Sequence, residues 1–156
     1  MMRGLLPVLA VLAVLATPAL SLRRSGIRSA CDQGWFSIAG NCYKFAQILL
    51  TWDDAFDHCE DRGSQLASVH TYAEYKGLLD HMNKNYAGTY WTSGASENGK
   101  WLWTATNENM NRAWWGRNPS TADDQCAYFC SYTNKYWNKS CNNKVRFICQ
   151  KPQNPW

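Results

Sequence analysis

The sequence has 156 residues and a formal net charge of +4, and 18% of its residues are charged. Charges of both signs are interspersed, and the small positive excess does not indicate a nucleic-acid-binding protein. The length suits one domain.

The first 21 residues are typical of a secretory signal peptide, with one basic residue, Arg3, before an apolar run that ends in small residues. The run is shorter than the roughly 20 residues that cross a membrane. We predict cleavage after Ala19 or Ser21, which removes Arg3 and lowers the net charge from +4 to +3. No second long apolar run follows, so we expect a secreted, extracellular chain without membrane insertion. Residues 22–30 are polar and without periodicity, so we expect them to form a flexible leader.

The cysteines all follow this signal peptide, which places them in an oxidising compartment. They are Cys31, Cys42, Cys59, Cys126, Cys130, Cys141 and Cys149. An odd number predicts three disulfides and one cysteine left over. No two cysteines have C-x-x-C spacing, and the histidines form no H-E-x-x-H motif, so the pattern does not indicate zinc.

The domain begins with a predicted hairpin at residues 31–45, where two short aromatic segments flank the turn Ala39-Gly40-Asn41. An amphipathic helix follows. It begins after Thr51 with acidic residues in its first turn, and Gly63 marks its end. Its predicted buried face consists of Trp52, Ala55, Phe56 and Cys59.

We expect residues 65–69 to form a short strand that leads into a second helix. Thr71 and Glu74 have the spacing of a capping box at its start. The apolar stripe of this helix consists of Tyr72, Tyr75, Leu78, Leu79 and Met82.

After the second helix, the sequence predicts further strands and one long loop. We expect residues 97–100 to form a hairpin turn between strands at 90–93 and 101–103. Residues 104–124 are polar and aperiodic, and such long loops are usually functional or disordered. Strands at 126–132 and 145–149 complete an α+β domain over 31–151, followed by a tail at 152–156.

The order of these elements and their short motifs resembles the C-type lectin-like domain over residues 31–151. The matching segments are GWF at 34–36, NCYKF at 41–45, TWDDAFDHC at 51–59, LASV at 66–69, YWTSG at 90–94, GKWLW at 99–103, the interval from Cys126 to Cys141, WN at 137–138 and FIC at 147–149. The resemblance implies an α+β fold of two helices with small antiparallel sheets and a long loop region. It also implies three disulfides: Cys31 with Cys42, Cys59 with Cys149, and Cys126 with Cys141. Cys130 has no counterpart, and is either a buried free thiol or a bridge between two chains.

Sugar-binding members of this family hold calcium through a loop triplet of the Glu-Pro-Asn or Gln-Pro-Asp type, an acidic residue and a Trp-Asn-Asp triplet. Calcium takes about six to eight oxygen ligands, and sugar hydroxyls complete the shell. Matching the proline of the loop triplet to Pro119 makes Asn118 and Ser120 the loop candidates. Matching without a gap gives Gly116, Arg117 and Asn118 instead. Asp124 fits the acidic position.

The last triplet departs from the family pattern, because Asn138 is kept whereas Lys139 replaces the carboxylate. A unit charge about 4 Å from a divalent ion is repelled by roughly 2 kcal/mol even in water. The metal candidates that remain are Asp123, Asp124 and Asn138, and they predict a calcium site that is weak or absent. Asn138-Lys139-Ser140 is also an N-glycosylation sequon, and a glycan on Asn138 would compete with sugar binding there.

Two adjacent tryptophans precede the loop triplet. The family packs one tryptophan beneath the loop, so either Trp114 or Trp115 is free to stack on a sugar or fill an interface, unless both are core residues. We take Trp115 as a sugar-binding candidate together with Asn118, Ser120, Asp124 and Asn138.

The resemblance implies a secreted carbohydrate-recognition protein whose partners are glycans or glycoproteins. The alternative is a protein-interaction or extracellular structural module with the same fold, linked as a homodimer through Cys130. No G-x-S-x-G or zinc-hydrolase motif is present and the cysteines are used in bridges, so an enzyme is not expected.

Overall fold

We describe residues 31–153 from a computed structural model. The predicted signal peptide, the leader at 22–30 and residues 154–156 of the predicted tail lie outside the described residues. Between residues 31 and 153, no helix is long and apolar enough to span a membrane.

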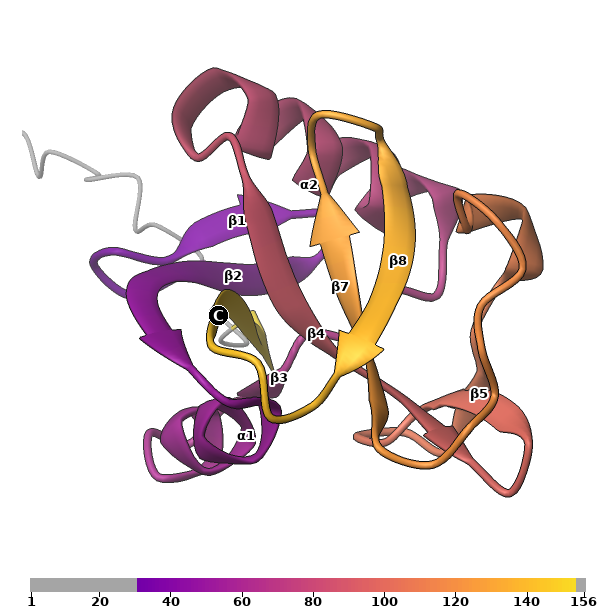
Figure 1. The fold of residues 1–156 in the computed structure, drawn as a ribbon. Coiled ribbons are helices and arrows are strands. Elements are labelled where there is room, and N and C mark those ends of the chain that lie inside the picture. The colour runs from indigo at the N-terminus through magenta and orange to yellow at the C-terminus, as the bar shows by residue number, and fades with distance from the viewer. Residues whose placement is uncertain (1–30, 154–156) are drawn as a thin grey trace, which may run out of the picture.

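The amino-terminal hairpin brings the two ends of the domain together. β1 (Phe36–Ile38) pairs antiparallel with β2 (Asn41–Leu50), and the turn residues Ala39 and Gly40 have φ angles of 47° and 88°. Positive φ at both central residues is typical of tight two-residue hairpin turns. β2 also pairs with the last strand, β9 (Val145–Pro152), and Figure 1 shows the C-terminal end beside β2. The predicted hairpin is confirmed.

The first predicted helix is α1 (Trp52–Glu60). The Thr51 hydroxyl oxygen accepts a hydrogen bond from the Asp54 backbone N–H at 3.2 Å, and so caps the helix. Trp52, Ala55 and Cys59 are buried, as the helical spacing predicts, whereas Phe56 is only partly buried against the same cluster. The Trp52 indole Nε1 donates to the Thr92 carbonyl at 2.8 Å, which fixes α1 against the sheet.

The second predicted helix is α2 (Tyr72–Asn85), which follows the short strand β3 (Gln65–Leu66). β3 is shorter than the predicted strand at 65–69, because only its two residues pair in register with β9. The capping box of α2 is present. One residue of the predicted stripe is wrong: Tyr72, the first residue of the helix, is 67% exposed, and its ring contacts only Tyr75 among the described aromatic rings.

A mixed sheet is organised around β4 (Thr89–Glu97). β4 pairs parallel with β9 and antiparallel with β5 (Lys100–Trp103) and β7 (Gln125–Cys130). The predicted turn between β4 and β5 is confirmed, since Asn98 and Gly99 have φ angles of 50° and 76°.

Three elements lie in segments that we did not predict as regular structure. They are β6 (Glu108–Asn109), the 3-10 turn η1 (Arg112–Trp114) and β8 (Lys135–Ser140). All six residues of β8 pair with β7, yet only Tyr136 among them is buried. The apolar alternation that identifies a half-buried strand is therefore missing from this segment.

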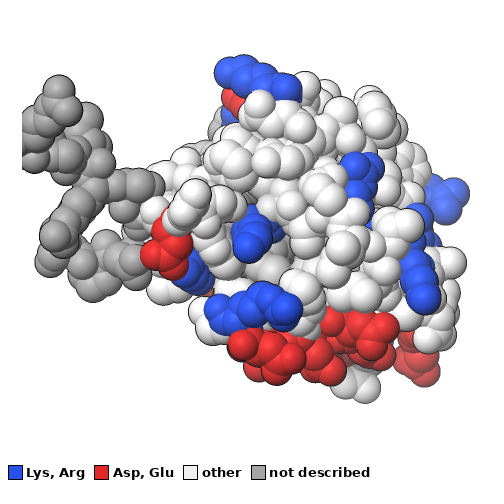
Figure 2. All heavy atoms as spheres, turned by 90° about the vertical axis from the view of Figure 1, so that its left-hand side faces the viewer, with Lys and Arg blue, Asp and Glu red and all other residues white. Residues whose placement is uncertain are grey.

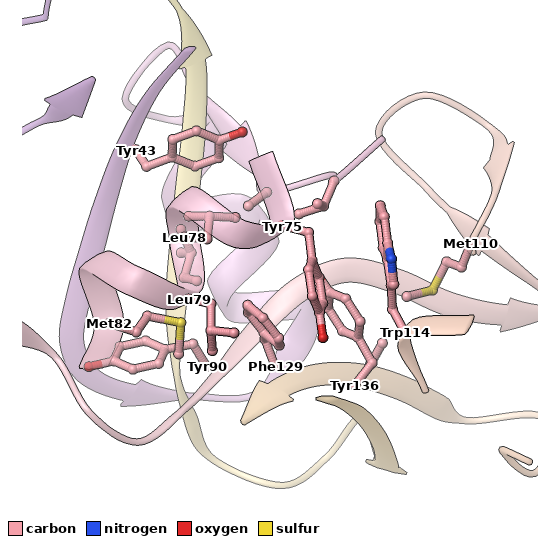
Figure 3. Close-up of a cluster of buried hydrophobic side chains, with 14 of the residues drawn as sticks. Tyr43, Tyr75, Leu78, Leu79, Met82, Tyr90, Met110, Trp114, Phe129 and Tyr136 are labelled. Atoms are coloured by element: carbon pink, nitrogen blue, oxygen red, sulfur yellow. The ribbon is translucent and has the colours of Figure 1, made fainter. Parts of the chain in front are cut away.

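The two helices cover opposite faces of the sheet. Tyr75, Leu78 and Leu79 of α2 pack against Tyr90, Phe129 and Tyr136 of the strands, and Figure 3 shows this cluster. Trp52 and Cys59 of α1 belong to a second cluster with Trp91. Consecutive strand residues point to opposite faces, which explains why Tyr90 and Trp91 serve different clusters.

Three disulfides connect these elements: Cys31–Cys42, Cys59–Cys149 and Cys126–Cys141. These are the pairs that the family resemblance implies. The first closes the amino-terminal hairpin, the second joins α1 to β9, and the third joins the start of β7 to the segment after β8.

Cys130 forms no disulfide within the described residues and is only 8% exposed. It is the last residue of β7, where it is paired with Thr89 of β4 and Lys135 of β8. A bridge between two chains needs its sulfur at the surface. The burial therefore favours the free thiol over the intermolecular bridge.

This burial predicts a slowly reacting thiol. We expect an aromatic disulfide reagent to modify Cys130 on the order of tenfold or more slowly in the native protein than in denaturant, because buried structural thiols are inert. One thiol per chain should react after unfolding, and none in a Cys130→Ala control. A dimer on a non-reducing gel that reduction converts to monomer would contradict this assignment.

Candidate ligand-binding site

The long loop is held against the sheet by hydrogen bonds at several points. The Met110 N–H donates to the Trp101 carbonyl at 3.0 Å, and the Trp101 indole Nε1 donates to the Ser120 carbonyl at 3.1 Å. The Gly116 N–H donates to the Tyr136 carbonyl of β8 at 3.0 Å. The loop is thereby placed over β5 on one side and beside β8 on the other.

The two adjacent tryptophans point to different parts of the core. Trp114 ends η1 and stacks on the Tyr75 ring of α2, with 4.8 Å between centroids. Trp115 follows in extended backbone and packs on Trp101, with 4.6 Å between centroids. Each is only 8% exposed. Neither tryptophan therefore presents an open ring face. The sequence left two alternatives, one tryptophan free to stack on a sugar or fill an interface, or both in the core, and the structure favours the second.

A hollow of about 330 Å³ lies between β5 and the long loop. Its buried floor consists of Trp101, Met110 and Trp115. Exposed polar and basic residues form the rest of the lining: Lys100, Asn109, Arg112, Arg117, Asn118 and Thr121, with Gly99 and Pro119. The hollow thus combines an apolar base with a polar, basic rim.

Two of the sequence candidates line this hollow, namely Trp115 and Asn118. The Asn118 side-chain oxygen accepts a hydrogen bond from Nη2 of Arg112 at 3.1 Å, which links the two sides of the loop. The guanidinium of the neighbouring Arg117 lies 5.8 Å from the centroid of the Trp137 ring. That ring packs so closely on Gly116 that a Cβ there would lie 2.3 Å from it.

The other sugar-binding candidates lie outside the hollow. The Ser120 hydroxyl accepts a hydrogen bond from the Ala122 N–H at 3.3 Å within the loop. The Asp124 carboxylate accepts hydrogen bonds from the Ser140 hydroxyl at 2.7 Å and the Asn142 amide at 3.3 Å. These groups are used in local contacts and do not converge with Asn118.

The predicted metal ligands do not fit a calcium site of the family kind. Asn138 directs its amide nitrogen to the Gln125 side-chain oxygen at 2.7 Å, and Asp123 is exposed. Within residues 31–153, no three His, Cys, Asp or Glu side chains are grouped so that they could hold a metal ion. Two carboxylates and one amide offer at most five oxygens, so water or sugar hydroxyls would have to supply the rest of the about six to eight that calcium takes.

Lys139 weakens the site in a different way from the expected repulsion. Its ammonium lies 4.3 Å from the centroid of the Tyr128 ring, and burial lowers the pKa of Lys139. Neighbouring residues of a strand point to opposite faces, so this side chain is directed away from that of Asn138. The site lacks a carboxylate at this position, whereas the charge of Lys139 is accommodated elsewhere.

The basic rim is the part of the site that sequence reasoning missed. Lys100 comes from β5, Arg112 from η1 and Arg117 from the loop after it. They form no motif, because their separations in sequence follow no period. The length of the loop and the gapless family match through Arg117 located the region, but neither indicated a basic rim.

Together these features define a class of protein. Two helices on a mixed sheet, three disulfides and a hollow beneath the long loop are typical of a disulfide-stabilised recognition domain. The chain belongs to the C-type lectin family, since the family model for the lectin C-type domain matches residues 48–151. This is a family of lectin-like binding proteins and not of enzymes.

Individual relatives cover most of the chain. Regenerating islet-derived protein 3-beta from Mus musculus is 34% identical over 140 residues, which cover 79% of this chain and 78% of the relative. The C-type lectin lectoxin-Phi1 from Philodryas olfersii is 29% identical over 141 residues, covering 85% and 90%. The solved structure of a calcium-independent type II antifreeze protein matches with a TM-score of 0.69 and 26% identity, covering 80% and 95%.

Proposed function

We propose that the protein is a secreted carbohydrate-recognition module that binds saccharides in the long-loop hollow without calcium. The observation that carries this proposal is the hollow itself, with its tryptophan floor and polar rim. Sites for small ligands are concave, mostly apolar, and contain a few well-placed polar groups, with volumes of about 300–1,000 Å³. The volume of about 330 Å³ falls within that range.

The chemistry of the lining suits a sugar. C–H groups of a sugar can lie against the small accessible parts of Trp101 and Trp115 in the floor, although both residues are largely buried. The amide groups of Asn109 and Asn118 provide both donors and acceptors for ring hydroxyls. None of these contacts requires a calcium ion.

Secretion and glycosylation belong to the same proposal. The sequon asparagine, Asn138, is partly exposed on β8, which pairs with β7 on one edge and contacts the long loop through Tyr136 on the other. A glycan there lies outside the residues that line the hollow, so modification of Asn138 and binding in the hollow are compatible in this arrangement.

The test is retention of the secreted protein on immobilised neutral and acidic saccharides, with and without a calcium chelator. We expect retention on at least one matrix, and we expect the chelator to leave it unchanged. Thr121→Trp, which adds a ring at the exposed lip of the hollow, should abolish retention by filling it. Asn83→Trp, on the exposed surface of α2, adds the same ring elsewhere and should retain binding.

Two results would overturn the proposal. Release by the chelator would place sugar binding at a metal site rather than in the hollow. Failure to bind any saccharide matrix, by a protein whose far-ultraviolet spectrum and unfolding transition are those of a folded domain, would favour the protein-interaction module.

A further inference from the structure

We propose that the hollow selects acidic saccharides, with a sulfate or carboxylate group held at the rim by Arg112 and Arg117 and assisted by Lys100. The inference rests on the proposed function and deepens it, because it names the class of saccharide. It is carried by the charge of the rim, which the proposal of sugar binding does not need.

The lining of the hollow contains three cationic side chains and no carboxylate. The ion pairs between described residues are Lys76–Asp80 and Lys151–Asp32, with His70–Glu108 as a third only when the imidazole is protonated, and none of them includes a residue of the rim. A concave site lined by one sign of charge over an apolar base concentrates ions of the opposite sign. The rim is therefore suited to an anionic ligand.

The two arginines give this charge a direction. Arg112 is oriented by its hydrogen bond to Asn118, and Arg117 by its position over the Trp137 ring. Neither contact neutralises the guanidinium, and each leaves N–H donors available. A guanidinium binds the oxygens of a carboxylate or an oxyanion through two parallel hydrogen bonds, which a lysine cannot do.

Five acidic residues gather on another part of the molecule, whereas Glu97, Glu108, Asp123 and Asp124 flank the hollow in sequence without lining it. The outer face of α1 and the residue after it carry exposed acids: Asp53, Asp54, Asp57, Glu60 and Asp61. Figure 2 shows acidic side chains along the lower edge, where α1 lies, and Figure 1 places β5 on the opposite side of the domain from α1. The positive charge at the hollow is thus separated from the acids of α1, in a chain whose net charge is only +4.

A saccharide fits the hollow better than an acidic peptide does. The volume of about 330 Å³ lies at the lower end of the range for small-molecule sites, about 300–1,000 Å³. An extended peptide needs a longer groove or a free strand edge beside the cations. The two lining amides, Asn109 and Asn118, also match hydroxyl groups, which an acidic peptide of Glu residues lacks.

The experiment compares matched pairs of sugars by calorimetric titration in the presence of chelator. One pair is N-acetylglucosamine and its 6-sulfate, and the other is glucose and glucuronic acid, so that the two sources of negative charge are measured separately. We expect at least one acidic member to bind about tenfold or more tightly than its neutral partner. Inorganic sulfate and a hepta-glutamate peptide should each bind more weakly than that sugar.

Variants connect this preference to the rim. Arg112→Gln and Arg117→Gln should each reduce affinity for the acidic sugar by about tenfold and hardly change affinity for the neutral one. Arg112→Lys keeps the charge and loses the paired donors, so its affinity should be intermediate. Lys84→Gln, at an exposed position of α2, removes the same charge and should have no effect.

The outcomes separate this inference from the proposed function. Equal binding of neutral and acidic sugars overturns the inference and leaves the sugar site intact, whereas binding of no sugar overturns both. Glutamate peptide that binds as tightly as the acidic sugar overturns the choice of a saccharide. A preference for acidic sugars that survives both arginine variants overturns the assignment to the rim.

Discussion

Replacing both Cys59 and Cys149 with alanine is expected to lower the free energy of unfolding by about 4.6 kcal/mol. The bridge joins residues that are 90 positions apart, and it connects α1 to β9. A crosslink over so long a segment removes much of the conformational entropy of the unfolded chain, which stabilises the folded state. Both cysteines are buried, so alanine would also leave some packing unfilled.

The matched control is Cys126→Ala with Cys141→Ala. That bridge spans 15 residues, for which the same entropy argument gives about 3 kcal/mol. Both double variants are best made with Cys130 replaced by alanine, so that no thiol remains to exchange with the other bridges. Denaturant unfolding should give the larger loss for the Cys59–Cys149 pair. An equal loss, or a larger one for the shorter segment, would contradict the entropy argument.

The helices and the hairpin turns could be predicted from the sequence because their signals are local. Thr51 and the Thr71–Glu74 capping box mark helix starts within a few residues, and both caps are present in the structure. The Asn98-Gly99 turn requires positive φ at both residues, which this pair adopts readily. Each of these signals depends on neighbouring residues and on no contact from far along the chain.

β8 and the candidate site could not be predicted in the same way. β8 is defined by its pairing with β7, and its side chains are too polar to show a buried face. The rim of the hollow is assembled from Lys100, Arg112 and Arg117, which only the folded loop brings together. The resemblance to sugar-binding relatives directed attention to Asp124 and Asn138, whereas the structure places the hollow elsewhere.

The position of Lys139 shows why a missing ligand and a repulsive charge are different predictions. Sequence reasoning expects an ammonium at the place of a metal ligand. In the structure the ammonium instead lies over the Tyr128 ring, and Asn138 bonds to Gln125. Restoring a carboxylate with Lys139→Asp would therefore also remove a contact between β8 and β7, and a single substitution would not rebuild the calcium site.

Glu74→Ala is expected to lower the free energy of unfolding by about 3 kcal/mol or more, because Glu74 is a buried acceptor for several donors. The side chain is mostly inaccessible, with the residue only 5% exposed. One carboxylate oxygen accepts hydrogen bonds from the Asn41 amide at 2.9 Å and the Tyr43 hydroxyl at 3.3 Å. The other accepts from the backbone N–H groups of His70 and Thr71, each at 2.9 Å. Alanine would leave these donors, which join β2 to the start of α2, without their acceptor.

Two other substitutions distinguish this network from a general effect of losing a glutamate. Glu60→Ala removes an exposed carboxylate at the end of α1 and should change stability by less than about 0.5 kcal/mol. Glu74→Gln keeps the shape and one acceptor oxygen but places its NH2 group against donors at the other end, so its loss should be smaller than that of Glu74→Ala and larger than that of Glu60→Ala. If Glu60→Ala and Glu74→Ala had similar unfolding transitions, the result would contradict a stabilising role for the buried hydrogen-bond network of Glu74.

The pH dependence of stability provides an independent check on Glu74. Burial raises the pKa of its carboxyl, but the hydrogen bonds from His70 and Thr71 outweigh burial and hold the pKa below the ordinary value of 4.5. The folded protein therefore binds this proton less readily than the unfolded chain does. The stabilisation is complete above the ordinary pKa and is lost as the pH falls through the lowered one. The difference in melting temperature between wild type and Glu74→Gln should accordingly be largest near pH 6 and should shrink towards pH 3. A difference that stays constant over that range would mean that the carboxylate charge contributes nothing to the fold.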